Sequence, residues 1–140
     1  LEEYFMIANQ HVHVLDEFNN FMEEEIYQMM VATTEDQDEL ILENTTTLKV
    51  ARWWNRACDI IPCNGGKDIG IQKILDYFNF NKEEATAFGD GGNDISMLKY
   101  VGTVVAMGNA KDNVKAIADY ITDSVQEDGI VSALKHFEII

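Results

Sequence analysis

The sequence contains few prolines, cysteines and basic residues, and the shortages of cysteine and of basic residues each exclude a class of protein. It contains one proline, two cysteines, and 10 basic residues against 25 acidic ones, which gives a net charge of −15. Such a charge argues against unaided binding to nucleic acid or to an anionic membrane surface. Two cysteines are too few for the disulfide framework of a small secreted domain. We therefore expect a cytoplasmic protein without a nucleic-acid or membrane partner.

Long apolar runs are also missing from the sequence. The longest span only a few residues, for example residues 104–107, whereas a membrane-spanning helix needs about 18 or more consecutive apolar residues. The chain nevertheless has 140 residues, of which 46% are hydrophobic and 25% charged. This composition is typical of a chain that buries a hydrophobic core.

Glycine is absent from residues 1–60, and all nine glycines lie from Gly65 onward. The same 60 residues hold 13 acidic and only 3 basic side chains. Pro62, together with Asn64-Gly65-Gly66, forms the one strong cluster of residues that interrupt helices and strands. We therefore predict two parts, residues 1–63 and residues 64–140.

The first part has a mixed pattern of helices and strands. Two extended runs on either side of Asn55-Arg56 predict a β-hairpin, in which Trp53 and Trp54 point to opposite faces. The expected elements are helices at residues 14–22 and 36–43 and strands at residues 26–32, 47–54 and 57–61.

The second part alternates regularly between helix and strand. Ile71, Ile74, Leu75 and Phe78 recur at helical spacing and predict a helix over residues 67–78 with one buried face. Such alternation is typical of βαβ units and predicts an α/β fold with a parallel sheet. The expected elements are strands at residues 85–88, 103–107 and 120–121 and helices from Asp94, at residues 111–118 and at residues 130–137.

One strand-to-helix turn, residues 88–94, concentrates acidic and amide side chains. Asp90, Asn93 and Asp94 follow a buried strand, and ligands in open α/β folds bind at the carboxyl ends of the strands. Carboxylate oxygens suit a hard cation such as Mg²⁺. Because Asp, Asn and Gly are also ordinary turn residues, the alternative is a structural turn in which Asp94 or Asn93 caps the next helix.

Lys67 directly follows Gly65-Gly66, at the start of the helix over residues 67–78. A helix N-terminus beside a lysine can bind an anion, although a single lysine in this position is more often a surface residue. Together with the carboxylate turn one βα unit later, Lys67 predicts a site with one fixed positive charge and one divalent metal. That combination suits a phosphate monoester.

Four segments in this order resemble the C-terminal half of a Cof-type phosphatase, a haloacid dehalogenase superfamily member with a class IIB cap. The segments are residues 64–70 (NGGKDIG), 87–98 (AFGDGGNDISML), 105–110 (VAMGNA) and 127–130 (EDGI). The resemblance is close over residues 64–140 and loose over the first 60. It implies half of a Rossmann-like core at residues 64–140 and the C-terminal part of a smaller α+β cap at residues 1–63.

The resemblance implies a Mg²⁺-dependent hydrolase of small phosphorylated metabolites, such as sugar phosphates, that works through a phospho-aspartyl intermediate. Asp90 would then bind Mg²⁺, and Asp94 would bind it directly or through water, or orient Lys67. Asn93 would contact the substrate phosphate. Lys67 would neutralise the transferring phosphoryl group and the nucleophile. Phosphoryl transfer depends largely on such positioning and charge neutralisation.

The sequence departs from the family where the nucleophile is expected. The family uses the first Asp of an Asp-X-Asp motif at the end of an N-terminal strand, and the one candidate here, Asp36-Gln37-Asp38, follows no apolar strand and is typical of a helix start. The family's Ser/Thr phosphate-binding motif is absent as well. Because the chain starts with Leu1, we expect a fragment of a longer phosphatase that is inactive alone. The alternative is a degenerate remnant that binds phosphate and metal without turnover.

P-type ATPases and phosphoserine phosphatases share the Gly-Asp-Gly-X-Asn-Asp turn. The absence of membrane segments and the presence of the segment at residues 127–130 weigh against both. Loss of the family's nucleophile strand would also leave an open edge beside the strand that leads to Asp90. Open strand edges pair with other chains, so we expect the isolated chain to self-associate.

Overall fold

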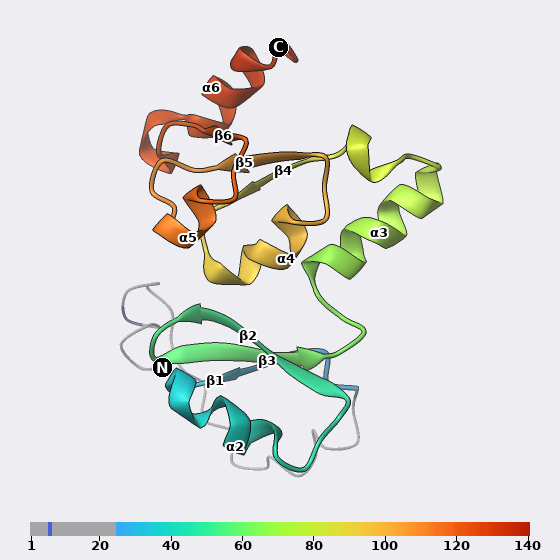
Figure 1. The fold of residues 1–140 in the computed structure, drawn as a ribbon, viewed down its shortest axis with the longest axis vertical. Coiled ribbons are helices and arrows are strands. Elements are labelled where there is room, and N and C mark those ends of the chain that lie inside the picture. The colour runs from blue at the N-terminus through green and yellow to red at the C-terminus, as the bar shows by residue number, and fades with distance from the viewer. Residues whose placement is uncertain (1–5, 7–24) are drawn as a thin grey trace. The chain divides into compact units, whose positions relative to one another are not determined.

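The computed structural model describes residue 6 and residues 25–140 and is shown in Figure 1. The chain divides into two compact units, residues 1–63 and residues 64–140. The helix predicted at residues 14–22 lies outside the described residues.

The first unit contains an antiparallel sheet with the hairpin that the sequence predicts. Strand β3 (Ala57–Pro62) lies between β1 (Met29–Val31) and β2 (Leu48–Trp54). Register pairs join Val50 to Ile60 and Met29 to Ile60, so both outer strands use the same central strand. The predicted hairpin is confirmed, and its turn falls at the polar pair between Trp54 and Ala57.

Arg52 connects this hairpin to the short helix α2 (Asp38–Leu42) and the 3-10 helix that precedes it (Glu35–Gln37). Its guanidinium forms an ion pair with Asp38 and donates a hydrogen bond to the carbonyl oxygen of Thr33 at 2.9 Å. The hydrogen bond to Asp38 raises the pKa of Arg52 above its ordinary value. One half-buried cation therefore fixes the helix against one face of the sheet.

The prediction that Trp53 and Trp54 point to opposite faces is wrong. The register of β2 against β3 shifts between Arg52 and Trp54. Because a β-bulge inserts an extra residue, it interrupts the alternation of side chains along the strand. The two indole rings consequently stack, with centroids 6.3 Å apart and an interplanar angle of 16°.

The second unit is an α/β fold, as predicted. Three parallel strands are ordered β4 (Thr86–Gly89), β5 (Thr103–Ala106) and β6 (Tyr120–Ile121). The connecting and flanking helices are α3 (Lys67–Phe78), α4 (Ile95–Leu98), α5 (Asp112–Lys115) and α6 (Gly129–His136). In Figure 1, α4 and α5 lie on the same side of this sheet.

The core of the second unit is built around β5, the middle strand. Val105 and Ala106 are fully buried because strands flank them on both sides. Leu98 from α4 and Val114 from α5 are also fully buried. The core therefore joins the helices after β4 and β5 to the sheet, and it holds the carboxyl ends of both strands in place. Its buried members are Ala87, Leu98, Val104, Ala106, Met107, Ala110 and Val114.

Helix α3 has the predicted bounds, but the prediction of a buried face is wrong. No residue of α3 is buried, and Ile74 and Phe78 are 60% and 61% exposed. Helical periodicity identifies the face of a helix that favours burial, but another segment must cover that face. Among the described residues this face is only partly covered, since Ile71 and Leu75 are half-buried while Ile74 and Phe78 are exposed.

Helix α5 is shorter than predicted. It ends at Lys115 instead of continuing to Ala118, because the next residues form tighter turns in which Ile117 and Ala118 donate to carbonyl groups three residues back. The N–H of Asp119 then donates a hydrogen bond to the carbonyl of Val104 in β5, just before β6 begins. Among the described residues, no helix is both long and apolar enough to cross a membrane.

The start of α6 depends on a glycine. A Cβ atom at Gly129 would lie 2.0 Å from the carbonyl oxygen of Asp123. The hydroxyl of Thr122 also donates a hydrogen bond of 2.6 Å to the carbonyl of Gly129. Because the obstructing atom belongs to the backbone, a side chain here requires the two segments to move apart.

We predict that Gly129→Ala lowers the free energy of unfolding by about 1–3 kcal/mol through overpacking. Urea unfolding of the chain measures this change. Gly70→Ala is the matched control, because no described atom apart from its chain neighbours and the backbone of α3 lies within 4 Å of its Cβ position. We expect Gly70→Ala to be neutral or to stabilise by up to about 1 kcal/mol through helix propensity. Equal unfolding midpoints for the two variants would contradict this account.

Candidate functional site

The turn after β4 is organised by the side chain of Asp94. Its Oδ2 atom accepts hydrogen bonds from the backbone N–H groups of Asp90 at 3.0 Å and Gly91 at 3.1 Å. Asp94 stands at the N-cap position of α4 without a side-chain capping hydrogen bond there, and the N–H that it accepts from Gly91 belongs to the N-cap of the preceding 3-10 helix (Gly92–Asp94). The carboxylate instead folds back onto the turn that precedes it and fixes the position of Asp90.

Gly89 allows the end of β4 to approach this carboxylate. A Cβ atom at Gly89 would lie 2.9 Å from both Asp94 Cβ and Leu98 Cδ1. Any larger residue would push the strand away from α4 and lengthen the hydrogen bonds to Asp94. The glycine therefore serves close packing at the point where the strand becomes the site.

Asp94 also forms an ion pair with Lys67, at the first position of α3. The side chain of Asp94 is 7% exposed, whereas that of Lys67 is 51% exposed. Burial alone would raise the pKa of Asp94, but the hydrogen bonds from Lys67, Gly91 and Asp90 outweigh it and lower this pKa below its ordinary value. Asp94 is therefore an anion held between a cation and two N–H dipoles.

Asp90 is exposed beside this pair and has one oxygen available. Its Oδ2 accepts a hydrogen bond of 3.2 Å from Nδ2 of Asn109. Its backbone carbonyl accepts the N–H of Lys111 at 3.2 Å. Oδ1 accepts no hydrogen bond from the described residues. The main chain and one side-chain oxygen of Asp90 are thus fixed, while the other oxygen can bind a ligand.

The structure brings three of the four predicted site residues together. Lys67, Asp90 and Asp94 line one cavity of about 510 Å³. Asn93 is not among its lining residues, and its Oδ1 lies instead 2.7 Å from the position of a Cβ on Gly91. The remaining wall is largely apolar and consists of Phe88, Gly89, Met97, Met107, Asn109, Val125 and Ile130.

Sequence reasoning assigned no role to Asn109, although this residue lies in one of the motif segments. It follows β5, the strand beside β4. Because parallel strands end at the same edge of a sheet, the rule that places Asp90 at the site also places Asn109 there. The position of Asn109 after a predicted parallel strand was therefore a sequence signal for its place at the site.

The carboxylates of this cavity offer part of the donor set for a divalent metal. Among the described residues, no group of three or more His, Cys, Asp or Glu side chains could hold a metal ion. Mg²⁺ is commonly held by one or two carboxylates together with water and substrate phosphate. The available oxygen of Asp90 fits that partial donor set, whereas both oxygens of Asp94 already accept hydrogen bonds.

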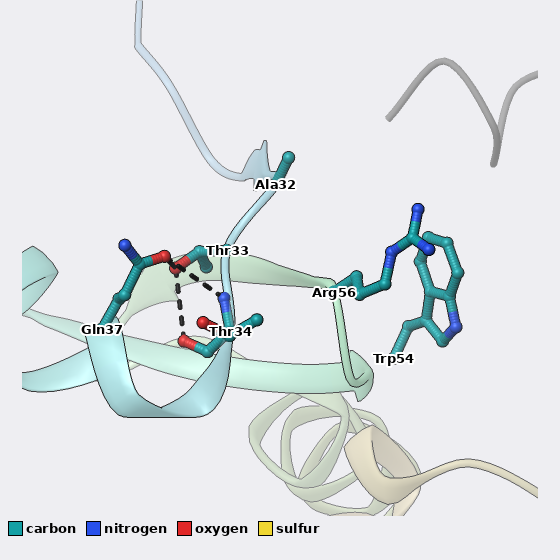
Figure 2. A pocket seen from close by; sticks show the side chains of 6 residues that line it. All are labelled: Ala32, Thr33, Thr34, Gln37, Trp54 and Arg56. Atoms are coloured by element: carbon teal, nitrogen blue, oxygen red, sulfur yellow. Dashed lines mark hydrogen bonds between the residues drawn. The ribbon is translucent and has the colours of Figure 1, made fainter.

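Figure 2 shows residues that line a second hollow, in the first unit. The volume of this hollow is about 290 Å³. Its polar groups bind one another: Thr33 Oγ1 donates to Gln37 Oε1 at 2.9 Å, and the guanidinium of Arg56 lies 5.0 Å from the ring centroid of Trp54. Among the residues that the structure describes, its lining includes no carboxylate, histidine or cysteine. The cavity of the second unit, which is lined by Lys67, Asp90 and Asp94, is therefore the better candidate for acid–base or metal chemistry.

Comparisons with known proteins agree with the arrangement of the second unit. The family model of haloacid dehalogenase-like hydrolases matches residues 2–134. A solved structure of the HAD subclass IIB sugar phosphatase BT4131 is 38% identical, with a TM-score of 0.86, and the match covers 99% of this chain and 54% of that one. The predicted resemblance to Cof-type phosphatases is confirmed.

Two curated relatives come from Bacillus subtilis. YkrA is 39% identical over 116 residues, which are 83% of this chain and 45% of YkrA. The 5-amino-6-(5-phospho-D-ribitylamino)uracil phosphatase YitU is 43% identical over 89 residues, which are 61% of this chain and 33% of YitU. The chain thus spans about half the length, or less, of these relatives.

The electrostatics of Asp94 predict a pH-dependent contribution to stability. A carboxylate with a lowered folded-state pKa stabilises the fold above its ordinary pKa, about 3.9, and this stabilisation is lost as the pH falls through the folded-state value. We expect Asp94→Asn to lower the free energy of unfolding by about 1–3 kcal/mol at pH 7 and by less at pH 3. Urea unfolding at the two pH values measures this difference.

Asp76→Asn is the control for this prediction, because Asp76 is an exposed residue of α3. Its effect should be small at both pH values. A penalty for Asp94→Asn that is the same at pH 3 as at pH 7 would contradict the assignment of Asp94 as a stabilised anion.

Proposed function

The chain belongs to the haloacid dehalogenase-like hydrolases, and on this premise we propose that it supplies half of the active site of a phosphatase. The observation that carries the proposal is the cavity that places the ion pair of Lys67 and Asp94 beside the available oxygen of Asp90. A fixed cation and a free carboxylate oxygen at the ends of parallel strands suit a phosphate monoester and a divalent metal.

Lys67 is the proposed phosphate-binding cation. It is the first residue of α3, and its ammonium group is held by Asp94. An ammonium in this position neutralises charge on the phosphoryl oxygens during transfer. Asp94 orients Lys67 and fixes the turn, since both of its oxygens accept hydrogen bonds. Asn93 is the further candidate for a contact with the phosphate.

Asp90 is the proposed ligand for Mg²⁺, through its available Oδ1 atom. When bound, the metal would neutralise phosphoryl oxygens and orient the phosphate. Asp90 suits this role because its backbone is fixed by Asp94 and its Oδ2 by Asn109. The remaining donors would be substrate, water and a carboxylate from another segment.

The nucleophile comes from another segment in this proposal. Asp36-Gln37-Asp38 lies across a 3-10 helix and the start of α2, and Asp38 is paired with Arg52. In the proposed reaction, an external aspartate attacks phosphorus while the bond to the metabolite oxygen breaks, and that oxygen takes a proton from a second acid. Water then hydrolyses the acyl phosphate to inorganic phosphate and free aspartate.

The free edge of β4 is the proposed place for that segment. Thr103 donates to the carbonyl of Ala85 and Met107 to that of Gly89, so residues 85, 87 and 89 direct their hydrogen-bonding groups toward β5. The backbones of Thr86 and Phe88 therefore face away from it. β4 has no second neighbour among the described strands, and an added strand here would end next to Asp90.

The proposed substrate is a small phosphorylated metabolite such as a sugar phosphate. One support is the similar sugar phosphatase structure. A second is a relative named kanosamine-6-phosphate phosphatase, which is 42% identical over 77 residues. The alternative is a module that binds phosphate and metal without turnover, which is favoured by the lack of a strand-borne Asp-X-Asp motif within these 140 residues.

We predict that Asp90→Asn in the full-length protein abolishes Mg²⁺-dependent release of phosphate from p-nitrophenyl phosphate. The loss should be at least about 100-fold, because a charged group that stabilises the transition state is removed. Circular dichroism should show an unchanged fold. Asp76→Asn, on the exposed side of α3, serves as the control and should retain full activity. Unchanged turnover in Asp90→Asn would refute the metal-binding role.

We also predict that the 140-residue chain alone self-associates through the edge of β4. Light scattering after size exclusion should give a mass above 15.9 kDa. Thr86→Pro should restore the monomer, because proline removes an outward N–H and is tolerated at the first residue of an edge strand. A clean monomer of the unmodified chain would contradict the prediction.

A further inference from the structure

We propose that Asn109 is a positioning residue of this site, whose amide holds the carboxylate of Asp90 so that only Oδ1 faces the ligand. The inference rests on the proposed function, since it assigns the residue that prepares Asp90 for metal and phosphate. The evidence is a chain of two hydrogen bonds that meet at one side chain.

The amide of Asn109 makes a different contact at each end. Nδ2 donates to Asp90 Oδ2 at 3.2 Å, and Oδ1 accepts the backbone N–H of Val125 at 3.1 Å. The acceptor end therefore fixes the rotation of the amide group, which directs the donor end at Asp90. Asn109 is exposed, so these hydrogen bonds, more than packing, hold the side chain in place.

The backbone that carries Asn109 is itself anchored. The N–H of Gly108 donates to the carbonyl of Asp123 at 3.0 Å, and a Cβ on Gly108 would lie 2.7 Å from the nitrogen of Ser124. The segment after β5 is thus in close contact with the segment after β6. The side chain of Asn109 adds the connection to the turn after β4, so one residue links the carboxyl ends of β4, β5 and β6.

The two tasks need a side chain that donates at one end and accepts at the other, as an amide does. A carboxylate at position 109 could accept from Val125 but could not donate to Asp90. An alanine or a leucine would do neither, and Oδ2 of Asp90 would then compete with Oδ1 for the ligand position. Partners that orient a metal-binding carboxylate typically affect metal affinity or activity by about 10- to 100-fold.

The test measures binding of Mn²⁺ to the full-length protein by electron paramagnetic resonance, which requires no turnover. We expect Asn109→Ala and the similarly sized Asn109→Leu to weaken Mn²⁺ binding by about 10- to 100-fold. kcat/KM for p-nitrophenyl phosphate should fall by a similar factor. Asn113→Ala is the matched control, because Asn113 is an exposed asparagine of α5, and it should bind Mn²⁺ like the wild type.

A second variant removes the contact at the acceptor end of Asn109 without changing Asn109. Val125→Pro removes the N–H that Asn109 accepts but leaves Asn109 itself intact. Val125 is the first residue of a 3-10 helix after Ser124, whose ψ is 166°, and proline suits such a first helical position. We expect Val125→Pro to weaken Mn²⁺ binding in the same direction but less than Asn109→Ala.

The outcomes distinguish this inference from the proposed function. If Asp90→Asn abolishes Mn²⁺ binding while Asn109→Ala, Asn109→Leu and Val125→Pro bind within about twofold of the wild type, the inference is overturned and the proposed function stands. If the wild type itself binds no Mn²⁺, both fail. Weakened binding in the two Asn109 variants with normal binding in Asn113→Ala supports the positioning role.

Discussion

The carboxylate of Asp94 receives hydrogen bonds from three directions, and the arrangement of the candidate site depends on it. Two come from the backbone of the turn after β4 and one from Lys67 in α3. Because this carboxylate is almost completely buried, it would be costly without these partners. The same contacts place the lysine beside the turn and leave Asp90 exposed. A buried anion thus determines the positions of the two groups that face the ligand.

The parallel sheet brings these groups together over long stretches of sequence. Lys67 begins the helix before β4, Asp90 follows β4, and Asn109 follows β5. The buried core around β5 fixes the strands relative to one another, and the glycines at the strand ends permit the close contacts. The fold therefore supplies a rigid edge with a positive group, a free carboxylate oxygen and an orienting amide. In the proposed enzyme, a further segment supplies the nucleophile.

Most of this framework could be predicted from the sequence because local signals specify it. The spacing of apolar residues predicted the bounds of α3, and the alternation of helices and strands predicted the parallel sheet. Features that depend on distant contacts were missed. The exposure of Ile74 depends on what covers α3, and the stacked tryptophans depend on a β-bulge. The position of Asn109 after β5 did indicate the site, but its hydrogen bonds to Asp90 and Val125 depend on which loops meet.

The most direct test of the account is the location of metal and phosphate in crystals of the full-length protein grown with Mn²⁺ and a phosphate analogue. Anomalous scattering locates the metal independently of activity. The account predicts one Mn²⁺ on the carboxylate of Asp90 and an oxyanion within hydrogen-bonding distance of the Lys67 ammonium. A metal bound elsewhere, with Asp90 and Lys67 free of ligand, would contradict it.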